Sequence, residues 1–440
     1  MKIAMRAPRA VLIAAAASAA ALVLAACGNS ASSNSSQAPL AGEQELKSAM
    51  STLIGAGGPP GVVVIVQDGT NRYELVDGKA DVTTGTAMTG SATSRIASIS
   101  KVYSGAILLD LASEGKLSLD APISTLLPTV PSAWGAATVS QVLQHTSGIP
   151  DYIKDPKFLK QFIADPQMQR TPQQLIGYVA KQPLNFAPGS TYEYSDTDNI
   201  VAGLIAEQIL GKPYAEILQD VVAQPMSLAN TNLPSTSDLP EGYIHGYAVE
   251  PPAATGAATA PPEDVSLLIN PGLAWASGGM ISTADDMNTY TRGYPAGDLF
   301  NANVLTDSNA FVPGGGGPPG PGTNSSGLAI YRYETACGTV FGHTGNMPGY
   351  TQFFGASQDG SKSVVVTVNS QISPKNAPTN YENLIAVQNQ AICSAMGQAS
   401  ASARASTSAS SRRGWRAARF RPPPAHPAHF GHFDTESGDR

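Results

Sequence analysis

Runs of apolar residues bounded by turn residues predict β-strands at both ends of the central part of the chain. Near the N-terminal side, Val-Val-Val-Ile-Val at 62–66 is followed by an Asp-Gly turn and a second expected strand at 72–76. Strand patterns return only late in the chain, and the last two of them are joined through Asp359-Gly360. These later strands are expected at 327–333, 339–342, 350–356 and 363–369.

Between these two groups of strands, apolar positions recur with helical spacing and are interrupted by Pro and Gly. We expect helices at 43–54, 98–114, 173–180 and 200–210. Strands at both ends with helices between them predict an α/β sandwich, in which one largely antiparallel sheet is flanked by helices and carries a mostly helical inserted lobe. The expected domain is 44–396, with an α/β lobe at 44–118 and 325–396, a helical lobe at 119–324, and a cleft between the lobes.

The first residues have the pattern of an export signal. Lys2, Arg6 and Arg9 precede an apolar run that ends in Leu-Ala-Ala-Cys at position 27. This end resembles the bacterial lipobox, which implies cleavage before Cys27 and its lipidation; an ordinary cleavage site is the alternative. Residues 28–43 are rich in Ser, Ala and Asn and suit a flexible tether. We therefore expect residues 1–27 to be a lipoprotein signal peptide and the protein to be anchored on the outer side of the cell membrane.

Charge is unevenly distributed along the chain. The net charge is −7, but residues 1–27 carry +3 and residues 401–440 carry +4, which leaves −14 for the body. An acidic body argues against nucleic acid as a partner. The tail at 397–440 has no apolar periodicity and is expected to be disordered, with electrostatic contact to anionic wall polymers or lipids as the alternative.

Two cysteines remain once Cys27 is set aside. Cys337 and Cys393 form an even pair in an exported protein, which predicts a disulfide; two buried free thiols are the alternative. The histidines of the body, at 145, 245 and 343, are widely separated, and the sequence has no Cys-x-x-Cys pair. We therefore expect no metal site and no cofactor.

Ser98 and Lys101 form the strongest chemical signal. At a spacing of three on a helix the two side chains share a face, so that the amine can take part in activating the hydroxyl. Ser113 with Lys116 has the same spacing, but it stands at the end of the helical pattern. Ser98 stands at the start of that pattern, where free backbone N–H groups can face an oxyanion.

Four further segments accompany this pair. Tyr194-Ser-Asp196 closes the segment 186–196, and Phe341-Gly-His343-Thr344-Gly345 follows later. The segments 143–149, with His-Thr-Ser-Gly, and 276–283, with Ser-Gly-Gly, lie before and between them. Together the five segments resemble the serine penicillin-recognising enzymes of the class C β-lactamase and D-alanyl-D-alanine carboxypeptidase type, over about 44–396. The His-Thr-Gly form, the late cysteines and Leu-Ala-Trp-Ala at 273–276 are more similar to the actinobacterial carboxypeptidase.

The resemblance implies three catalytic residues. Ser98 is expected to be the nucleophile that forms an acyl-enzyme. Tyr194 is expected to take the serine proton and return it to the leaving nitrogen, for which a phenol needs neighbouring positive charge. Lys101 is either the base, if burial favours its neutral form, or a cation that stabilises developing negative charge.

The same resemblance implies the binding residues of the third motif. His343 is expected to line the cleft as a group that titrates near neutrality, which would make activity depend on pH. Thr344, with Gly345 beside it, is expected to bind a substrate carboxylate. The oxyanion hole is expected at the backbone N–H groups of Ser98 and Asn346.

Three other residues are candidates for the substrate site. Asp196 stands where the family usually has Asn, and it would repel a carboxylate; it is expected to bind a substrate amine or to pair with Lys101. Arg332 is the only cation between position 293 and the third motif, and is a candidate for a C-terminal carboxylate or simply a surface charge. Trp275 either walls the cleft or belongs to the core.

The sequence thus predicts an exported serine hydrolase that forms an acyl-enzyme on a D-Ala-D-Ala-type peptide or a β-lactam. An esterase of the same family is one alternative, and a lipoprotein that binds penicillin or peptidoglycan without turnover is another. The expected partners are a small-molecule or peptide substrate, such as a peptidoglycan stem peptide, and the membrane through the lipid anchor.

Overall fold

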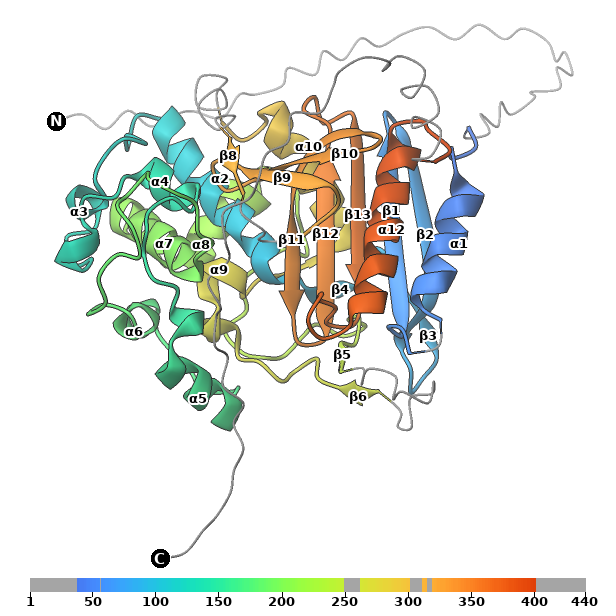
Figure 1. Cartoon of the computed structure of the whole chain (residues 1–440), viewed down its shortest axis with the longest axis horizontal. Coiled ribbons are helices and arrows are strands. Elements are labelled where there is room, and N and C mark those ends of the chain that lie inside the picture. The colour runs from blue at the N-terminus through green and yellow to red at the C-terminus, as the bar shows by residue number, and fades with distance from the viewer. Residues whose placement is uncertain (1–37, 56, 249–261, 301–310, 315–318, 401–440) are drawn as a thin grey trace, which may run out of the picture. The chain divides into compact units, whose positions relative to one another are not determined.

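A computed structural model describes residues 38–55, 57–248, 262–300, 311–314 and 319–400. In this described part, nine strands form one antiparallel sheet in the order β3-β2-β1-β13-β12-β11-β10-β9-β8 (Figure 1). The strands are β1 Gly61–Asp68, β2 Asn71–Asp81, β3 Thr86–Ala87, β8 Val312–Pro313, β9 Thr323–Ser326, β10 Tyr331–Thr335, β11 Gly338–Met347, β12 Tyr350–Ala356 and β13 Lys362–Val368. The expected antiparallel sheet built from both ends of the domain is confirmed, since β1 pairs with β13.

Strand β1 is buried on both faces of the sheet. Val62, Val64 and Val66 point to one face of the sheet and Val63 and Ile65 to the other, and all five are fully buried. A strand covered on both faces has an unbroken apolar run instead of an alternating one, as in the sequence here. The sheet is therefore the middle layer of the domain.

Helices cover both faces of this sheet (Figure 1). Helices α1 (Glu43–Leu53) and α12 (Pro378–Ala395) pack together on the face of Val62, Val64 and Val66. The other face is covered by α2 (Ser100–Ser113) and α10 (Ala284–Ala296), and the remaining helices extend this layer. They are α3 Ile123–Leu126, α4 Val139–Leu143, α5 Pro156–Ala164, α6 Pro172–Gly177, α7 Asp196–Leu210, α8 Tyr214–Leu218 and α9 Trp275–Gly278.

Short elements complete the domain. Strands β4 (Thr93–Arg95) and β7 (Ile281–Thr283) form a two-stranded sheet, and β5 (Tyr247–Ala248) pairs with β6 (Glu263–Asp264). Short 3₁₀ turns lie at Ala97–Ile99, Ser132–Trp134, Tyr152–Lys154 and Pro271–Leu273, and a π-helical turn lies at Gln219–Ala223. The pairing of β4 with β7 brings the segment before Ser98 next to the segment after α9.

The late strands differ from their expected positions. The expected strand at 327–333 is wrong over residues 327–330, which form a turn closed by the hydrogen bond from Gly327 N to Ile330 O. The apolar side chains of this turn are buried in the core, so their pattern resembles that of a strand. In contrast, β11 is longer than expected and extends to Met347, because polar residues 343–346 continue the strand.

The expected disulfide is present, whereas both ends of the chain lie outside the described residues. Cys337 and Cys393 are bonded and tie the turn between β10 and β11 to α12. The predicted signal peptide, Cys27, residues 28–37 of the tether and the tail from residue 401 lie outside the described residues. Within the described ranges, no helix combines the length and the apolar character needed to cross a membrane.

Candidate active site

Ser98 lies in a short 3₁₀ turn, Ala97–Ile99, that leads directly into α2. Ala97 has a φ of 48°, a strained value for a residue with a side chain. The turn is held by hydrogen bonds from Ile96 N to Met280 O and from Ser100 Oγ to Ala97 O. Its neighbours are buried, whereas Ser98 is partly exposed to a cavity. The expected helix therefore begins two residues later, and Ser98 precedes its first turn.

Lys101 is bound to Ser98 and to a counter-ion. Its Nζ donates to Ser98 Oγ at 3.1 Å, to Asp196 Oδ1 at 2.5 Å and to the carbonyl of Ser277 at 2.7 Å. These three bonds use all three protons of an ammonium group that is 1% exposed. A buried charge is tolerated when it is paired and hydrogen-bonded in this way. Of the two expected roles of Asp196, the structure shows the pair with Lys101.

Asp151 holds the backbone of Asp196. The backbone N–H of Asp196 donates to Asp151 Oδ1 at 3.2 Å, where α7 begins. Burial, and then the nearby Asp196 carboxylate, raise the pKa of Asp151 to about 7. The side chains of Asp151 and Asp196 thus lie in one buried region, where Lys101 pairs with Asp196 and Lys154 Nζ lies 3.7 Å from Asp151 Oδ2.

Tyr194 lies against Lys101, with the Nζ atom 4.9 Å from the centre of its ring. Its hydroxyl has no hydrogen-bond partner among the described residues. Burial raises the pKa of Tyr194 well above its usual value, and the Asp196 carboxylate raises it further, while the Ser98 hydroxyl lowers it. The phenol is therefore protonated at neutral pH, and it is available as a donor because its Oη is unoccupied.

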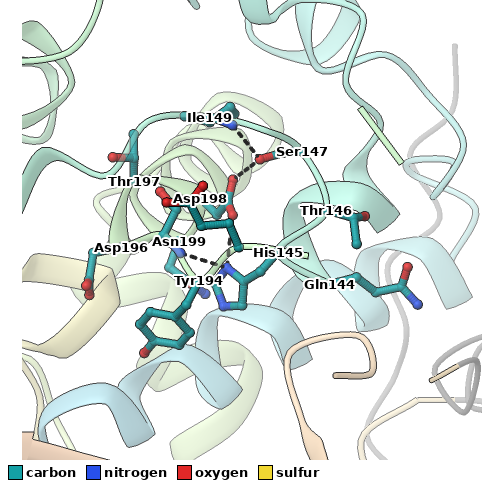
Figure 2. A network of polar contacts seen from close by, with 12 residues as sticks. Gln144, His145, Thr146, Ser147, Ile149, Tyr194, Asp196, Thr197, Asp198 and Asn199 are labelled. Carbon is teal, nitrogen blue, oxygen red and sulfur yellow. Dashed lines mark hydrogen bonds and ion pairs between the residues drawn. The ribbon is translucent and has the colours of Figure 1, made fainter. Parts of the chain in front are cut away.

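A buried polar network holds the other side of Tyr194 (Figure 2). The His145 ring lies 4.6 Å from the Tyr194 ring, and His145 Nδ1 is 2.9 Å from Asp198 Oδ2. Ser147 Oγ donates to Asp198 Oδ1 at 2.6 Å, and the Ser195 N–H donates to His145 Nδ1 at 3.5 Å. Sequence reasoning missed Asp198; its only signal was its position two residues after Asp196.

Burial sets the protonation of this network. It lowers the pKa of His145 to about 3, with a further contribution from the Lys101 charge, and it raises the pKa of Asp198 well above the usual value. The imidazole is therefore neutral, and one hydrogen bond joins its Nδ1 to Asp198 Oδ2. This neutral ring packs against the ring of Tyr194 and brings no charge to that side of it.

Strand β11 supplies the opposite wall. Thr344, Gly345 and Asn346 line the same cavity as Ser98. A Cβ at Gly345 would lie 2.3 Å from the Ile96 carbonyl oxygen, so only glycine lets β11 approach the turn this closely. Asn346 Nδ2 donates to Ile372 O at 2.6 Å and fixes the segment after β13. The oxyanion hole at the N–H groups of Ser98 and Asn346 remains a prediction, and both residues face the same space.

The expectation that His343 titrates near neutrality is wrong. His343 is 1% exposed and is absent from the residues that line the cavity. Its Nδ1 donates to the Thr344 carbonyl at 2.5 Å, and its ring contacts Tyr331 edge-on. Burial, and then the charge of Lys101, lower the pKa of His343 to about 3. His343 is a neutral group behind the cavity wall.

Two other candidates do not reach the cavity. Arg332 lies on β10, where its Nε is 3.1 Å from Glu334 Oε1 and its guanidinium packs on Phe311. Trp275 packs against Tyr214, with ring centres 4.9 Å apart, and belongs to the edge of the core. Their predicted roles in substrate binding are therefore corrected to a surface ion pair and to core packing.

The cavity has a volume of about 570 Å³ and lies between α5 and the start of α12. Asp196, paired with Lys101, is the only charged side chain among the described residues that line it. No group of three or more His, Cys, Asp or Glu side chains within the described ranges is placed to hold a metal ion. Apolar lining residues on the α5 side are Tyr152, Ile153, Phe158, Leu159, Phe162, Ile269 and Leu273.

Proteins with similar sequences include an esterase and an amidase. Esterase EstB of Burkholderia gladioli is 27% identical over 320 residues, which are 65% of this chain and 79% of that protein. An N-acetylmuramyl-L-alanine amidase of Bacillus subtilis is 28% identical, but the chain spans only 43% of its length.

Solved structures match over most of the described domain. A D-stereospecific amidohydrolase from Streptomyces sp. is 28% identical, with a TM-score of 0.67 and coverage of 78% of this chain and 98% of that one. The octameric penicillin-binding protein homologue from Pyrococcus abyssi, at 21% identity and a TM-score of 0.66, covers 81% and 77% and supports the fold. The family described as Beta-lactamase matches residues 46–389, so the chain belongs to this family of serine hydrolases.

Proposed function

We propose that this protein is a serine hydrolase that forms an acyl-enzyme at Ser98 with an uncharged ester or amide. The observation that carries the proposal is the contact of 3.1 Å between Ser98 Oγ, which lines the cavity, and Lys101 Nζ behind it, with the charge of Lys101 balanced by Asp196. A hydroxyl held against an amine in a shielded cavity is the arrangement that activates a weak nucleophile.

Lys101 and Asp196 act together as the base in this mechanism. Ser98 Oγ attacks the substrate carbonyl, and its proton passes to Lys101 as one proton of the ammonium moves to Asp196, 2.5 Å away. An amide side chain at position 196 has no such capacity, whereas a carboxylate does. The N–H groups of Ser98 and Asn346 stabilise the oxyanion.

Tyr194 completes the cycle. Its protonated hydroxyl donates to the leaving oxygen or nitrogen as the bond to the carbonyl carbon breaks, and Lys101 returns a proton to the phenol. Water then attacks the ester of Ser98, gives up a proton to the same groups, and releases the acid and the free serine. The net reaction converts an ester or amide and water into an acid and an alcohol or amine.

The absence of a free cation from the described cavity lining favours an uncharged substrate. D-Ala-D-Ala peptides and β-lactams both carry a carboxylate, and recognition of a carboxylate favours Arg or Lys. Lys101 is already paired and Arg332 lies outside the cavity. The similar proteins include an esterase and a D-stereospecific amidohydrolase, which support this choice, and also relatives named D-alanyl-D-alanine carboxypeptidase, so the choice rests on the cavity lining.

A non-catalytic penicillin or peptidoglycan binder is the weaker proposal, because Ser98, Lys101 and Tyr194 form a complete reactive set. The location is proposed from the sequence alone. The basic and apolar start of the chain and the lipobox-like end at Cys27 support export and a lipid anchor on the outer side of the membrane.

Intact-mass spectrometry of the protein with an activated ester or a fluorescent penicillin tests the proposal. An adduct on Ser98 that forms with the ester and then decays is expected, with weaker labelling by the penicillin. Ser98→Ala should abolish the adduct, while Ser113→Ala, at the end of α2, should retain it. A stable adduct without turnover would favour a binder, and an adduct on another residue would overturn the assignment.

A further inference from the structure

Exposed apolar side chains gather beside the mouth of the cavity. Seven large hydrophobic residues are exposed in the described part of the chain, and five of them lie in two segments, 153–163 and 267–268. The five are Ile153, Leu159, Ile163, Leu267 and Leu268, at 38%, 42%, 79%, 41% and 39% exposure. Single exposed apolar residues need no explanation, but such a concentration marks a binding surface.

The two segments form one surface. Helix α5 buries Phe158 in the core and leaves Leu159 and Ile163, one turn apart, facing solvent. The segment at 267–270 is held beside the end of α5 by hydrogen bonds from Gln167 Nε2 to Leu267 O and from Asn270 N to Pro166 O. Packing within the domain therefore leaves this surface uncovered in the described structure.

This surface continues into the cavity that contains Ser98. Ile153 and Leu159 are both exposed to solvent and part of the cavity lining. Beyond them the wall is formed by Phe158, whose ring contacts those of Tyr152 and Phe162. An apolar path thus runs from solvent along α5 toward the nucleophile.

The lysines near this path do not provide a binding site for an anion. Lys154 Nζ is 3.1 Å from Glu193 Oε1, and Lys157 lies over the Tyr178 ring. Lys160 is exposed on α5 but does not line the cavity. A carboxylate on this arm of the substrate would therefore lose its water without gaining a partner in the cavity.

We propose that the substrate carries a large apolar arm without a carboxylate, and that this arm lies along Ile153, Leu159 and the aromatic wall behind them. This inference rests on the proposed function and adds the substrate class to it. Each methylene group transferred from water to the wall is expected to raise kcat/KM about three- to fourfold until the wall is filled.

Two series of nitrophenyl and naphthyl esters test the proposal with the full-length protein, below the concentration at which the esters form micelles. One series lengthens the acyl chain from acetate to octanoate, and the other enlarges the alcohol of an acetate ester. We expect kcat/KM to rise at least tenfold along one of the series. A carboxylate at the end of the longer arm should remove this gain.

Leu159→Ser and Ile153→Ser should each lower the ratio of kcat/KM for long and short esters at least about fivefold. Val82→Ser is the matched control, because Val82 is 38% exposed and lies outside the cavity. An unchanged ratio in both wall variants would overturn the proposal and would assign the patch to another role, such as contact with a lipid surface. Turnover that is independent of chain length would refute this inference alone, whereas no turnover and no adduct on Ser98 would refute the proposed function.

Discussion

Replacing Gly345 by alanine tests the packing that places β11 against the nucleophile. The added Cβ would lie 2.3 Å from the carbonyl oxygen of Ile96 and 3.4 Å from the Cβ of Ala97. A carbon and a carbonyl oxygen approach each other to about 3.3 Å without strain. Strand β11 and the turn that carries Ser98 would therefore have to separate by about 1 Å.

This displacement defines the expected magnitudes. Overpacking of a rigid site costs about 1–3 kcal/mol of unfolding free energy. A misplacement of catalytic groups by about 1 Å lowers the rate about 100-fold. We therefore expect Gly345→Ala to fold, to lose stability within that range, and to lose about 100-fold in kcat/KM for an activated ester.

Urea unfolding and steady-state ester hydrolysis measure the two effects. Gly177→Ala is the matched control, because a Cβ at this exposed position in α6 has nothing within 4 Å. Helix propensity predicts that the control gains up to about 1 kcal/mol and keeps full activity. If Gly345→Ala kept its activity within about threefold of the unaltered protein, the close approach of β11 would not be what positions Ser98.

The remaining predictions concern a buried carboxyl group and an exposed cation. The pKa of Asp151 is raised from its usual value near 4 to about 7, so between pH 4 and pH 7 the folded protein keeps a proton that the unfolded chain has lost. The contribution of Asp151 to the free energy of unfolding therefore falls as the pH rises through this range. The difference in free energy of unfolding between Asp151→Asn and the unaltered protein, measured in urea, should therefore shift in favour of the variant as the pH rises from 4.5 to 7.5. A difference that stays constant over this range would contradict the shifted pKa. Arg332→Ala should leave KM for a carboxylate-bearing ester within about twofold, whereas a tenfold rise would return Arg332 to the substrate site.

The sequence was sufficient for the features that depend on repeated local patterns. The apolar run of β1 and the strands of the C-terminal part predicted a sheet built from both ends of the domain, and the pairing of β1 with β13 confirms it. The resemblance to the β-lactamase and penicillin-binding enzymes is confirmed as well. Tyr194 comes from a different segment than Ser98 and Lys101, and the structure brings it against Lys101.

The errors arose where burial decides the chemistry. A histidine in a motif gives no sign that it lies behind the cavity wall, so the lowered pKa of His343 was not foreseen. Arg332 became a candidate for substrate binding because no other cation lies near it in the sequence. Along β10, however, side chains alternate between the two faces of the sheet, and Arg332 lies on the face opposite to the buried Tyr331 and Tyr333. The exposed apolar surface on α5 could not be predicted from the sequence either. Phe158 and Leu159 are both hydrophobic, and only the fold buries the first and exposes the second.

The pairing of Val62 with Val368 has a consequence for how the protein matures. The centre of the sheet cannot close until the last strand has been synthesised, and contacts between such distant residues make folding slow. The wall formed by Thr344, Gly345 and Asn346 arrives equally late, long after Ser98. A chain still being synthesised thus holds Ser98 without the strand that completes the wall of its cavity. The complete cavity around Ser98 therefore forms only after synthesis of the whole domain.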